Sequence, residues 1–248
     1  MLQLFKEIKE PGETGKYSKP VSGDSANMLA LESDKLWYEM GAQKRRLRMD
    51  TYLRIKRTID VVVSLAVLPF VLPLLGLCYI AVKVESPGPF LFFQKRTGKG
   101  GKPIKVYKLR TMVKNAAELR EKYMHLNELK PPDFKITNDP RVTKVGRFLR
   151  KASLDELPQI FNVLKGDMTL VGPRPSSYSA HTYDLWHTAR FELKPGITGL
   201  AQVCGRSDLL LDEKLRYDIA YLRNISLWLD IRILLRTLPV VFGGEGVK

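Results

Sequence analysis

The sequence predicts an α/β fold, in which short strands and several helices form a small core packed against one apolar membrane element. Three patterns support this prediction. Residues 90–94 and 104–109 are short apolar segments around a glycine-rich turn, which predicts a β-hairpin. Apolar residues recur at helical spacing in residues 157–164 and 217–241. Residues 61–82 carry no charge, and a chain of 248 residues can bury one core together with such an appendage.

The composition narrows the range of partners. The chain has 41 Lys and Arg against 26 Asp and Glu, which gives a formal net charge of +15. This excess indicates an anionic partner, such as nucleic acid, lipid headgroups or a nucleotide. Cys78 and Cys204 are the two cysteines, so no disulfide framework is expected, and the three histidines show no zinc-site spacing.

Residues 1–50 are predicted to form an N-terminal extension that is partly disordered and then helical. Residues 1–26 are polar, contain Gly and Pro breakers and show no sustained period. Early charged residues interrupt any apolar segment of a signal peptide. Helical character returns in residues 28–48, whose basic end could lie on anionic headgroups or be an ordinary solvated helix end.

Residues 61–82 indicate a membrane element. A helix of this length would reach about 33 Å, so a spanning helix is one interpretation. However, Pro69 and Pro73 lie near its middle and favour a kink, and basic residues flank both ends rather than one. These features favour two helical segments that enter one leaflet and return. Arg57 and Asp60 lie one turn apart just before the run, and we expect them to pair at the interface.

The positive charge is concentrated in residues 83–114, where Glu85 is the single acid. The predicted hairpin lies in this segment, with its turn at residues 98–102. A cationic hairpin beside a membrane element can hold a lipid phosphate or a nucleotide diphosphate, although a solvated basic surface would give the same pattern. The turn lacks the spacing of a Walker phosphate-binding loop.

Two helices are predicted next. Residues 118–130 form a charged amphipathic helix without evident chemistry. Residues 141–152 form a helix with one basic face that leads directly to a pair of carboxylates. The cations of this face are Arg141, Lys144, Arg147, Arg150 and Lys151.

The carboxylate pair, Asp155 and Glu156, is the centre of the predicted site. Ser153 and Glu156 have the spacing of a capping box, which would place Asp155 in a first helical turn, where the helix dipole favours an ionised carboxylate and a bound phosphate. Pro158 conflicts with a helix that starts at Leu154, so the helix kinks or begins later. The same spacing also fits two ordinary acidic residues at a helix start.

Arg174 follows the carboxylates, between Pro173 and Pro175. The prolines fix the backbone that presents the side chain, and a planar guanidinium suits phosphate oxygens. A basic helix face, two carboxylates and this arginine together form an economical diphosphate site. We interpret the arrangement as a nucleophile that faces a phosphate.

The C-terminal part offers fewer signals. Residues 194–199 are a turn that leads into a predicted short strand at 200–203, where Gln202, together with Arg206 after it, could recognise uridine or phosphate. The helix predicted over residues 217–241 belongs either to the core or to the membrane interface, with Trp228 at headgroup level. We favour the interface, because of the membrane element.

The chain closely resembles the bacterial sugar transferases that act on polyprenyl phosphate, the monotopic phosphoglycosyl transferases. The resemblance covers roughly residues 53–242 and depends on five ordered motifs. These are KRTID at 56–60, FFQKRTGKGG at 92–101, KVYKLRTM at 105–112, SLDELPQIFNVLKGDMTLVGPRP at 153–175 and KPGITGLAQVCGR at 194–206.

The resemblance implies a topology and a location. Residues 51–84 would form a re-entrant membrane helix hairpin broken at Pro73, although Leu72 stands where the family often has serine. Residues 85–248 would form the catalytic domain, with an interfacial C-terminal helix. All parts outside the bilayer would lie on the cytoplasmic face of a bacterial inner membrane.

The resemblance also implies an activity. Asp155 would attack the sugar-proximal phosphate of a UDP-sugar, UMP would leave, and polyprenyl (undecaprenyl) phosphate would take the phosphosugar in the first membrane step of exopolysaccharide, O-antigen, capsule or glycoprotein assembly. Glu156 would hold Mg²⁺, helped by Asp218. Residues expected to bind or brace the substrates are Arg174, Arg150, Arg147, Lys108, Arg110, Gln94, Arg96, Gln202 and Arg206. The family often has an aromatic residue at Leu200 and asparagine at Cys204.

Two other functions fit parts of the sequence. A nucleic-acid-binding protein would explain the net charge, but it leaves residues 61–82 without a role and shows no recognition module, so we expect no nucleic acid partner. A membrane-anchored protein without catalysis would explain the apolar run but not the carboxylates beside Pro-Arg-Pro. A homo-oligomer is compatible with either the enzyme or these alternatives.

Overall fold

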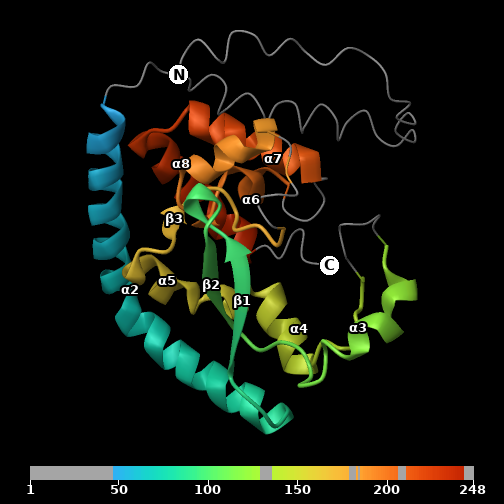
Figure 1. The fold of residues 1–248 in the computed structure, drawn as a ribbon. Helices are drawn as coiled ribbons and strands as arrows, with labels where there is room; N and C mark the ends of the chain where they lie inside the picture. Colours follow the sequence, from blue (N-terminus) through green and yellow to red (C-terminus); the bar gives the residue numbers. More distant parts are fainter. Residues whose placement is uncertain (1–46, 129–135, 179–182, 184, 206–210, 243–248) are drawn as a thin grey trace, which may run out of the picture. The chain divides into compact units, whose positions relative to one another are not determined.

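The computed structural model describes residues 47–128, 136–178, 183, 185–205 and 211–242, all of which belong to one compact unit, residues 37–248. Most of the predicted N-terminal extension lies outside the described residues. The fold combines helices with two small sheets, which confirms the mixed class (Figure 1). Helices α2 (Met49–Glu85), α4 (Lys144–Lys151), α5 (Gln159–Lys165), α6 (Leu200–Cys204), α7 (Leu211–Arg223) and α8 (Leu227–Phe242) surround the strands β1 (Leu91–Thr97), β2 (Pro103–Leu109), β3 (Thr169–Val171) and β4 (Gly196–Thr198).

Helix α2 contains the predicted membrane element and is long and apolar enough to cross a bilayer. The chain stays helical through Pro69 and Pro73, so the predicted interruption is not confirmed. The helix nevertheless changes direction part-way along its length (Figure 1). Such a bend is the effect expected of internal prolines, because each removes a backbone hydrogen bond and crowds the preceding turn.

The first half of α2 is attached to the rest of the unit through buried polar groups. The carboxylate of Asp230 on α8 accepts hydrogen bonds from Tyr52 Oη at 2.7 Å, Lys56 Nζ at 2.8 Å and Tyr221 Oη at 2.6 Å. The second half is attached differently, through the apolar residues Leu75, Cys78 and Val82.

The predicted pairing of Arg57 with Asp60 is wrong, because each side chain has a more distant partner. Arg57 donates to the carbonyl of Leu164 at 2.8 Å and thereby satisfies the C-terminal end of α5. Asp60 is buried, and its carboxylate accepts hydrogen bonds from Thr169 Oγ1 and from the Leu170 N–H. Both residues therefore hold α2 against the β3 region.

Strands β1 and β2 form the predicted antiparallel hairpin, with Phe92 opposite Lys108 and Gln94 opposite Val106. Because side chains alternate between the two faces of a strand, Lys108 is directed to the same face as Phe92. Gly100 and Gly101 have positive φ in the short turn, a conformation that glycine adopts without steric cost.

Strands β3 and β4 form a two-stranded parallel sheet. Their ends approach so closely that a Cβ at Gly196 would lie 2.2 Å from the Gly172 nitrogen, so glycine is required there. The segment predicted as a strand at 200–203 is instead helix α6, and this prediction is wrong. The strand residues of this region are the three that precede it, Gly196–Thr198.

The capping-box prediction is also wrong. Ser153 has a left-handed backbone with φ 55° and makes no side-chain cap bond, and residues Leu154–Glu156 form a short 3₁₀ turn. Helix α5 begins after Pro158, at Gln159, which agrees with the expected later start. Proline is tolerated there because the first N–H groups of a helix have no partner within it.

Two longer helices were predicted where the structure has shorter ones. Residues 118–130 contain only the four-residue helix α3 (Leu119–Lys122) and the 3₁₀ turn Met124–Leu126 within the described part of that segment. The C-terminal helix is two helices, α7 and α8, separated at residues 224–226. A 3₁₀ segment, η5 (Leu185–Glu192), precedes β4.

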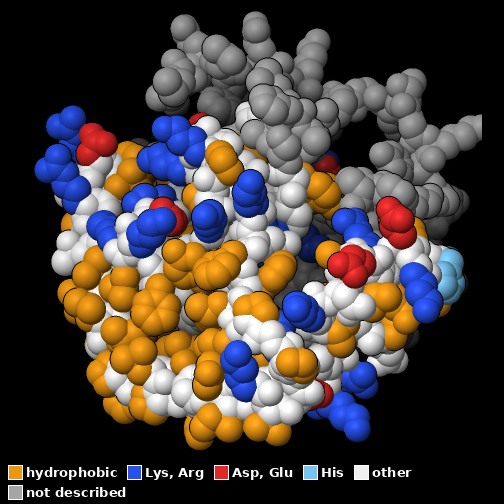
Figure 2. All heavy atoms as spheres, turned by 60° about the horizontal axis from the view of Figure 1, so that its bottom comes forward, with side chains coloured by type: hydrophobic (Ala, Val, Ile, Leu, Met, Phe, Trp, Pro, Cys, Tyr) orange, Lys and Arg blue, Asp and Glu red, His pale blue; other side chains and the backbone are white. Residues whose placement is uncertain are grey.

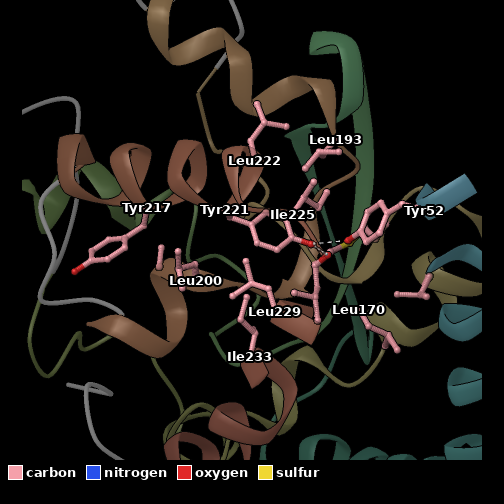
Figure 3. Close-up of a cluster of buried hydrophobic side chains, with 14 of the residues drawn as sticks. Tyr52, Leu170, Leu193, Leu200, Tyr217, Tyr221, Leu222, Ile225, Leu229 and Ile233 are labelled. Carbon is pink, nitrogen blue, oxygen red and sulfur yellow. Dashed lines mark hydrogen bonds between the residues drawn. The ribbon is translucent and has the colours of Figure 1, made fainter. Parts of the chain in front are cut away.

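The main core lies between α7, α8, the β3–β4 sheet and the start of α2. Figure 3 shows Tyr221 and Tyr52 directed toward one another from α7 and α2, with Leu200, Leu229 and Ile233 packed below them. A second apolar cluster lies under the hairpin and joins the second half of α2 to Leu109 and Leu149.

Candidate active site

Both predicted carboxylates line one cavity of about 1750 Å³. The cavity is larger than the 300–1,000 Å³ typical of a site for one small ligand. The apolar part of its lining includes Val67, Val71 and Leu74 of α2. The charged part includes Lys108, Arg150, Asp155, Glu156 and Arg174.

The backbone explains how the two carboxylates reach the cavity. The left-handed Ser153 turns the chain sharply after α4, and Asp155 and Glu156 then lie on the 3₁₀ turn between α4 and α5. Leu154 and Leu157, on either side of the pair, pack into the second apolar cluster. The apolar anchors fix the turn, so the two acids have little freedom to leave the cavity.

Glu156 is held by two cations. Its Oε1 accepts from Lys108 Nζ at 2.8 Å and from Arg174 Nη2 at 2.6 Å. Burial alone would raise the pKa of Glu156, but Arg174 and Lys108 outweigh burial and hold the pKa well below its usual range. Glu156 is therefore ionised at neutral pH.

Asp155 has a different environment. Its Oδ2 lies 4.0 Å from Lys108 Nζ, compared with 2.8 Å for Glu156. Burial raises the pKa of Asp155, Lys108 opposes this shift, and the neighbouring charge of Glu156 adds to it. Two adjacent carboxylates thus have pKa values displaced in opposite directions, which is typical of groups with separate chemical roles.

Arg150 precedes the two carboxylates in the sequence and Arg174 follows them, and both arginines line the cavity. Arg150 Nε donates to Thr111 Oγ1 at 2.9 Å, a partner that sequence reasoning missed. Helix α4 can pack this closely because Gly146 lies against the Thr111 carbonyl, where a Cβ would be 2.1 Å from the oxygen. Arg174 is presented by the turn after β3, in which the Gly196 N–H donates to the Pro173 carbonyl at 2.8 Å.

The sequence model of the family described as bacterial sugar transferase matches residues 51–244, most of the chain. The chain belongs to this family. It is 44% identical over 198 residues to the undecaprenyl-phosphate galactose phosphotransferase of Salmonella typhimurium, covering 77% of this chain and 41% of that protein. It is also 44% identical over 196 residues to the UDP-glucose:undecaprenyl-phosphate glucose-1-phosphate transferase of Caulobacter vibrioides, covering 74% and 68%.

A UDP-glucose:undecaprenyl-phosphate glucose-1-phosphate transferase of Escherichia coli is 42% identical over 193 residues, which cover 74% of this chain and 39% of that protein. The sugar transferase described here therefore spans about two fifths of the length of two of these three relatives. The shared region includes the carboxylates, the hairpin and helix α2.

The other residues predicted to bind or brace the substrates lie at different places in this sugar transferase. Gln94 accepts a hydrogen bond from Arg96 Nη2 at 2.7 Å, and both line the cavity. Burial and the charge of Arg174 lower the pKa of Arg96 to about 10. Arg110 braces the loop after α2 by donating to the carbonyls of Ser86 and Pro87.

Gln202 and Arg147 make no such contacts among the described residues. Gln202 lines the cavity, and its amide N and O are buried without a hydrogen-bond partner among the described residues. Arg147 is exposed on α4 and is absent from the cavity wall as described. Arg206 lies outside the described residues.

Asp218 lines the cavity, but its carboxylate forms a buried ion pair with Arg190 at 2.7 Å. Burial raises the pKa of Asp218 to about 6, and Arg190 opposes the shift. Within the described ranges, no group of three or more His, Cys, Asp or Glu is arranged as a metal site. Sequence reasoning missed Arg190, since it is one cation in an unpatterned segment.

Proposed function

We propose that this sugar transferase moves a phosphosugar from a UDP-sugar to a polyprenyl phosphate such as undecaprenyl phosphate and releases UMP, as the first membrane step of glycan assembly. The observation that carries the proposal is the pair Asp155 and Glu156, which lie partly buried in one cationic cavity and have pKa values displaced in opposite directions. Two of the relatives are named UDP-glucose:undecaprenyl-phosphate glucose-1-phosphate transferase, and these names support a UDP-sugar and undecaprenyl phosphate as the two substrates.

The proposed reaction has two displacements at one phosphorus atom. An Asp155 oxygen bonds to the sugar-proximal phosphorus, the bond from that phosphorus to the bridging oxygen breaks, and UMP leaves with the electron pair. An oxygen of the lipid phosphate then bonds to the same phosphorus, and the bond to Asp155 breaks. The covalent intermediate allows the two anionic substrates to enter separately, which avoids their mutual repulsion.

The cations around the carboxylates suit this chemistry. Lys108 contacts Glu156 and lies 4.0 Å from Asp155, so it can attract the incoming phosphate without leaving the site. Arg174 and Arg150 add two guanidinium groups to the lining of the cavity. Preorganised cations of this kind stabilise negative charge that develops on a transferred phosphoryl group.

The acidic groups also suit Mg²⁺, which prefers oxygen ligands and is often bound by one or two carboxylates together with substrate phosphates. Glu156 is the proposed ligand, with Asp218 as a further candidate, and both line the same cavity. When bound, Mg²⁺ would offset part of the negative charge of the diphosphate. Both carboxylates already have cationic partners, since Asp218 pairs with Arg190 and Glu156 pairs with Lys108 and Arg174.

The apolar part of the cavity lining supports a lipid substrate. It includes Val67, Val71 and Leu74 of α2 together with Leu91 and Phe92 of β1. An isoprenoid chain leaving the bilayer along α2 would bring its phosphate toward the carboxylates. We propose that these apolar residues receive the polyprenyl chain.

The surface supports membrane association. Figure 2 shows hydrophobic side chains gathered over a broad area of one face of the molecule. Phe70 of α2 is 79% exposed and Trp228 of α8 is 60% exposed. We propose that α2 enters and leaves the same leaflet, with residues 85–248 on the cytoplasmic face and α8 at the interface.

The test uses the purified full-length chain in detergent with Mg²⁺ and a panel of UDP-sugars, assayed for UMP release with and without undecaprenyl phosphate. We expect UMP release, a phosphosugar mass on the Asp155 peptide when lipid is omitted, and loss of both in Asp155→Asn with an unchanged unfolding temperature. Turnover by Asp155→Asn at the wild-type rate would refute the nucleophile. Absence of UMP release with every sugar would favour a membrane-anchored protein without this activity.

A further inference from the structure

A buried ion pair lies beside the proposed catalytic groups and contacts neither carboxylate. Asp218 on α7 is 2% exposed and Arg190 on η5 is 6% exposed, and their charged atoms are 2.7 Å apart. Ionised groups at this depth are costly to bury unless they are paired and hydrogen-bonded. The pair therefore needs an explanation beyond general stability.

Arg190 has a second contact that points to its role. Its Nη2 donates to the backbone carbonyl of Arg174 at 2.6 Å. The side chain of Arg174 in turn donates to Glu156 Oε1 at 2.6 Å. One buried guanidinium thus connects Asp218 to the residue that binds Glu156.

The Arg190 contact completes the support of the Pro-Arg-Pro turn. The Pro173 carbonyl accepts from the Gly196 N–H at 2.8 Å, and the Ser176 carbonyl accepts from the Thr97 N–H at 3.0 Å. Backbone groups thus hold the turn on both sides of Arg174. The carbonyl of Arg174 instead accepts from the side chain of Arg190, so this contact can be removed by substitution without altering the sequence of the turn.

Arg190 is fixed on its other faces as well. Its guanidinium lies 5.9 Å from the ring centre of Tyr183 and 5.8 Å from that of Phe191. Such cation–π contacts favour a guanidinium more than an aliphatic group. The planar fork of arginine can also serve a carboxylate and a carbonyl at the same time, which an ammonium group does less well.

We propose that Arg190 and Asp218 are positioning residues: Asp218 orients Arg190, and Arg190 fixes the backbone of Arg174, so that the Arg174 guanidinium meets Glu156 and the substrate diphosphate. The inference rests on the proposed phosphosugar transfer. It gives Asp218 a role that requires no contact with a metal.

The experiment is a double-mutant cycle in the full-length protein. Arg190→Gln and Asp218→Asn are each combined with Arg174→Ala, and UMP release and UDP-sugar affinity by titration calorimetry are measured for every variant. We expect Arg190→Gln to lower kcat/KM by about 10- to 100-fold in the wild-type background. In the Arg174→Ala background the same change should have less than about a twofold effect.

Two further variants separate positioning from folding. Arg190→Lys keeps the charge pair with Asp218, so it should retain the wild-type unfolding temperature and still lower kcat/KM. Arg216→Gln is the matched control, because Arg216 forms an exposed ion pair with Asp212 on the same helix as Asp218. It should leave activity and affinity unchanged.

Three results would overturn the inference. A fall by the same factor in both Arg174 backgrounds would indicate a purely structural ion pair. A higher Mg²⁺ requirement in Asp218→Asn but not in Arg190→Gln would indicate a metal ligand. Wild-type behaviour of Arg190→Gln would remove the role altogether, whereas an inactive wild-type protein would refute the proposed function instead.

Discussion

Substitution of Asp230 by asparagine tests the attachment of α2 to the rest of the unit. The Asp230 carboxylate accepts from Lys56 Nζ, Tyr52 Oη and Tyr221 Oη, with all three distances between 2.6 and 2.8 Å. The side chains of Lys56 and Asp230 are 10% and 9% exposed. Asparagine has nearly the same volume but no charge, so Lys56 would remain buried without its counterion.

The expected loss follows from that unpaired charge. Removal of one partner of a buried ion pair costs about 3–5 kcal/mol. A domain of this size loses roughly 2–4 °C of unfolding temperature per kcal/mol. We therefore expect Asp230→Asn to lower the unfolding temperature by about 10 °C.

The assay is thermal unfolding of the full-length protein in one detergent, followed by intrinsic fluorescence. Asp167→Asn is the matched control, because its Lys165 partner is 59% exposed and such pairs contribute less than about 1 kcal/mol. The double change Lys56→Met with Asp230→Asn removes both charges while an amide oxygen remains for the two tyrosine hydroxyls, so it should recover most of the loss. If Asp230→Asn shifted the unfolding temperature no more than Asp167→Asn, or if the double change gave no recovery, the reasoning would be refuted.

Two other predictions concern the site. Burial and the charge of Glu156 raise the pKa of Asp155, so activity that needs the ionised nucleophile is lost as pH falls through that raised pKa. Glu156→Gln removes the neighbouring charge and should move the acidic side of the kcat/KM profile to lower pH. An unchanged acidic side would contradict this prediction. Gly146→Ala places a Cβ 2.1 Å from the Thr111 carbonyl and should cost about 1–3 kcal/mol in thermal unfolding. Gly76→Ala is the control, because a Cβ at Gly76 meets no atom within 4 Å, and it should be neutral or stabilising by up to about 1 kcal/mol. Equal effects of Gly146→Ala and Gly76→Ala on stability would show that Gly146 is not closely packed.

The sequence was most informative where a local pattern decides the structure. The hairpin follows from two apolar segments and a glycine turn. Asp155, Glu156 and Arg174 line one cavity, while the binding of a diphosphate there stays a prediction. The long uncharged run predicted an apolar membrane element. Helix α2 contains this run but extends beyond it at both ends, and its continuity through Pro69 and Pro73 was not expected.

The predictions that were wrong concern contacts between distant segments. Arg57 and Asp60 have the spacing of a helical pair, yet each binds a backbone or hydroxyl group more than 100 positions away. Residues 200–203 form a helix, because packing against the core overrides a weak strand preference. Thr111 and Arg190 act through such contacts as well, so periodicity gave no sign of them.

Helix α2 is fastened to the protein by two different kinds of force. Around Lys56 and Asp60 the attachment is ionic and hydrogen-bonded. Around Leu75, Cys78 and Val82 it is apolar, and the last residue of the helix, Glu85, accepts hydrogen bonds from the N–H groups of Lys144 and Val145. Apolar contacts weaken on cooling, whereas the hydrogen bonds of Glu85 fasten the end of the helix without burying apolar surface. A chilled sample should therefore loosen first between the bend and Glu85, with both ends of the helix still held by polar contacts.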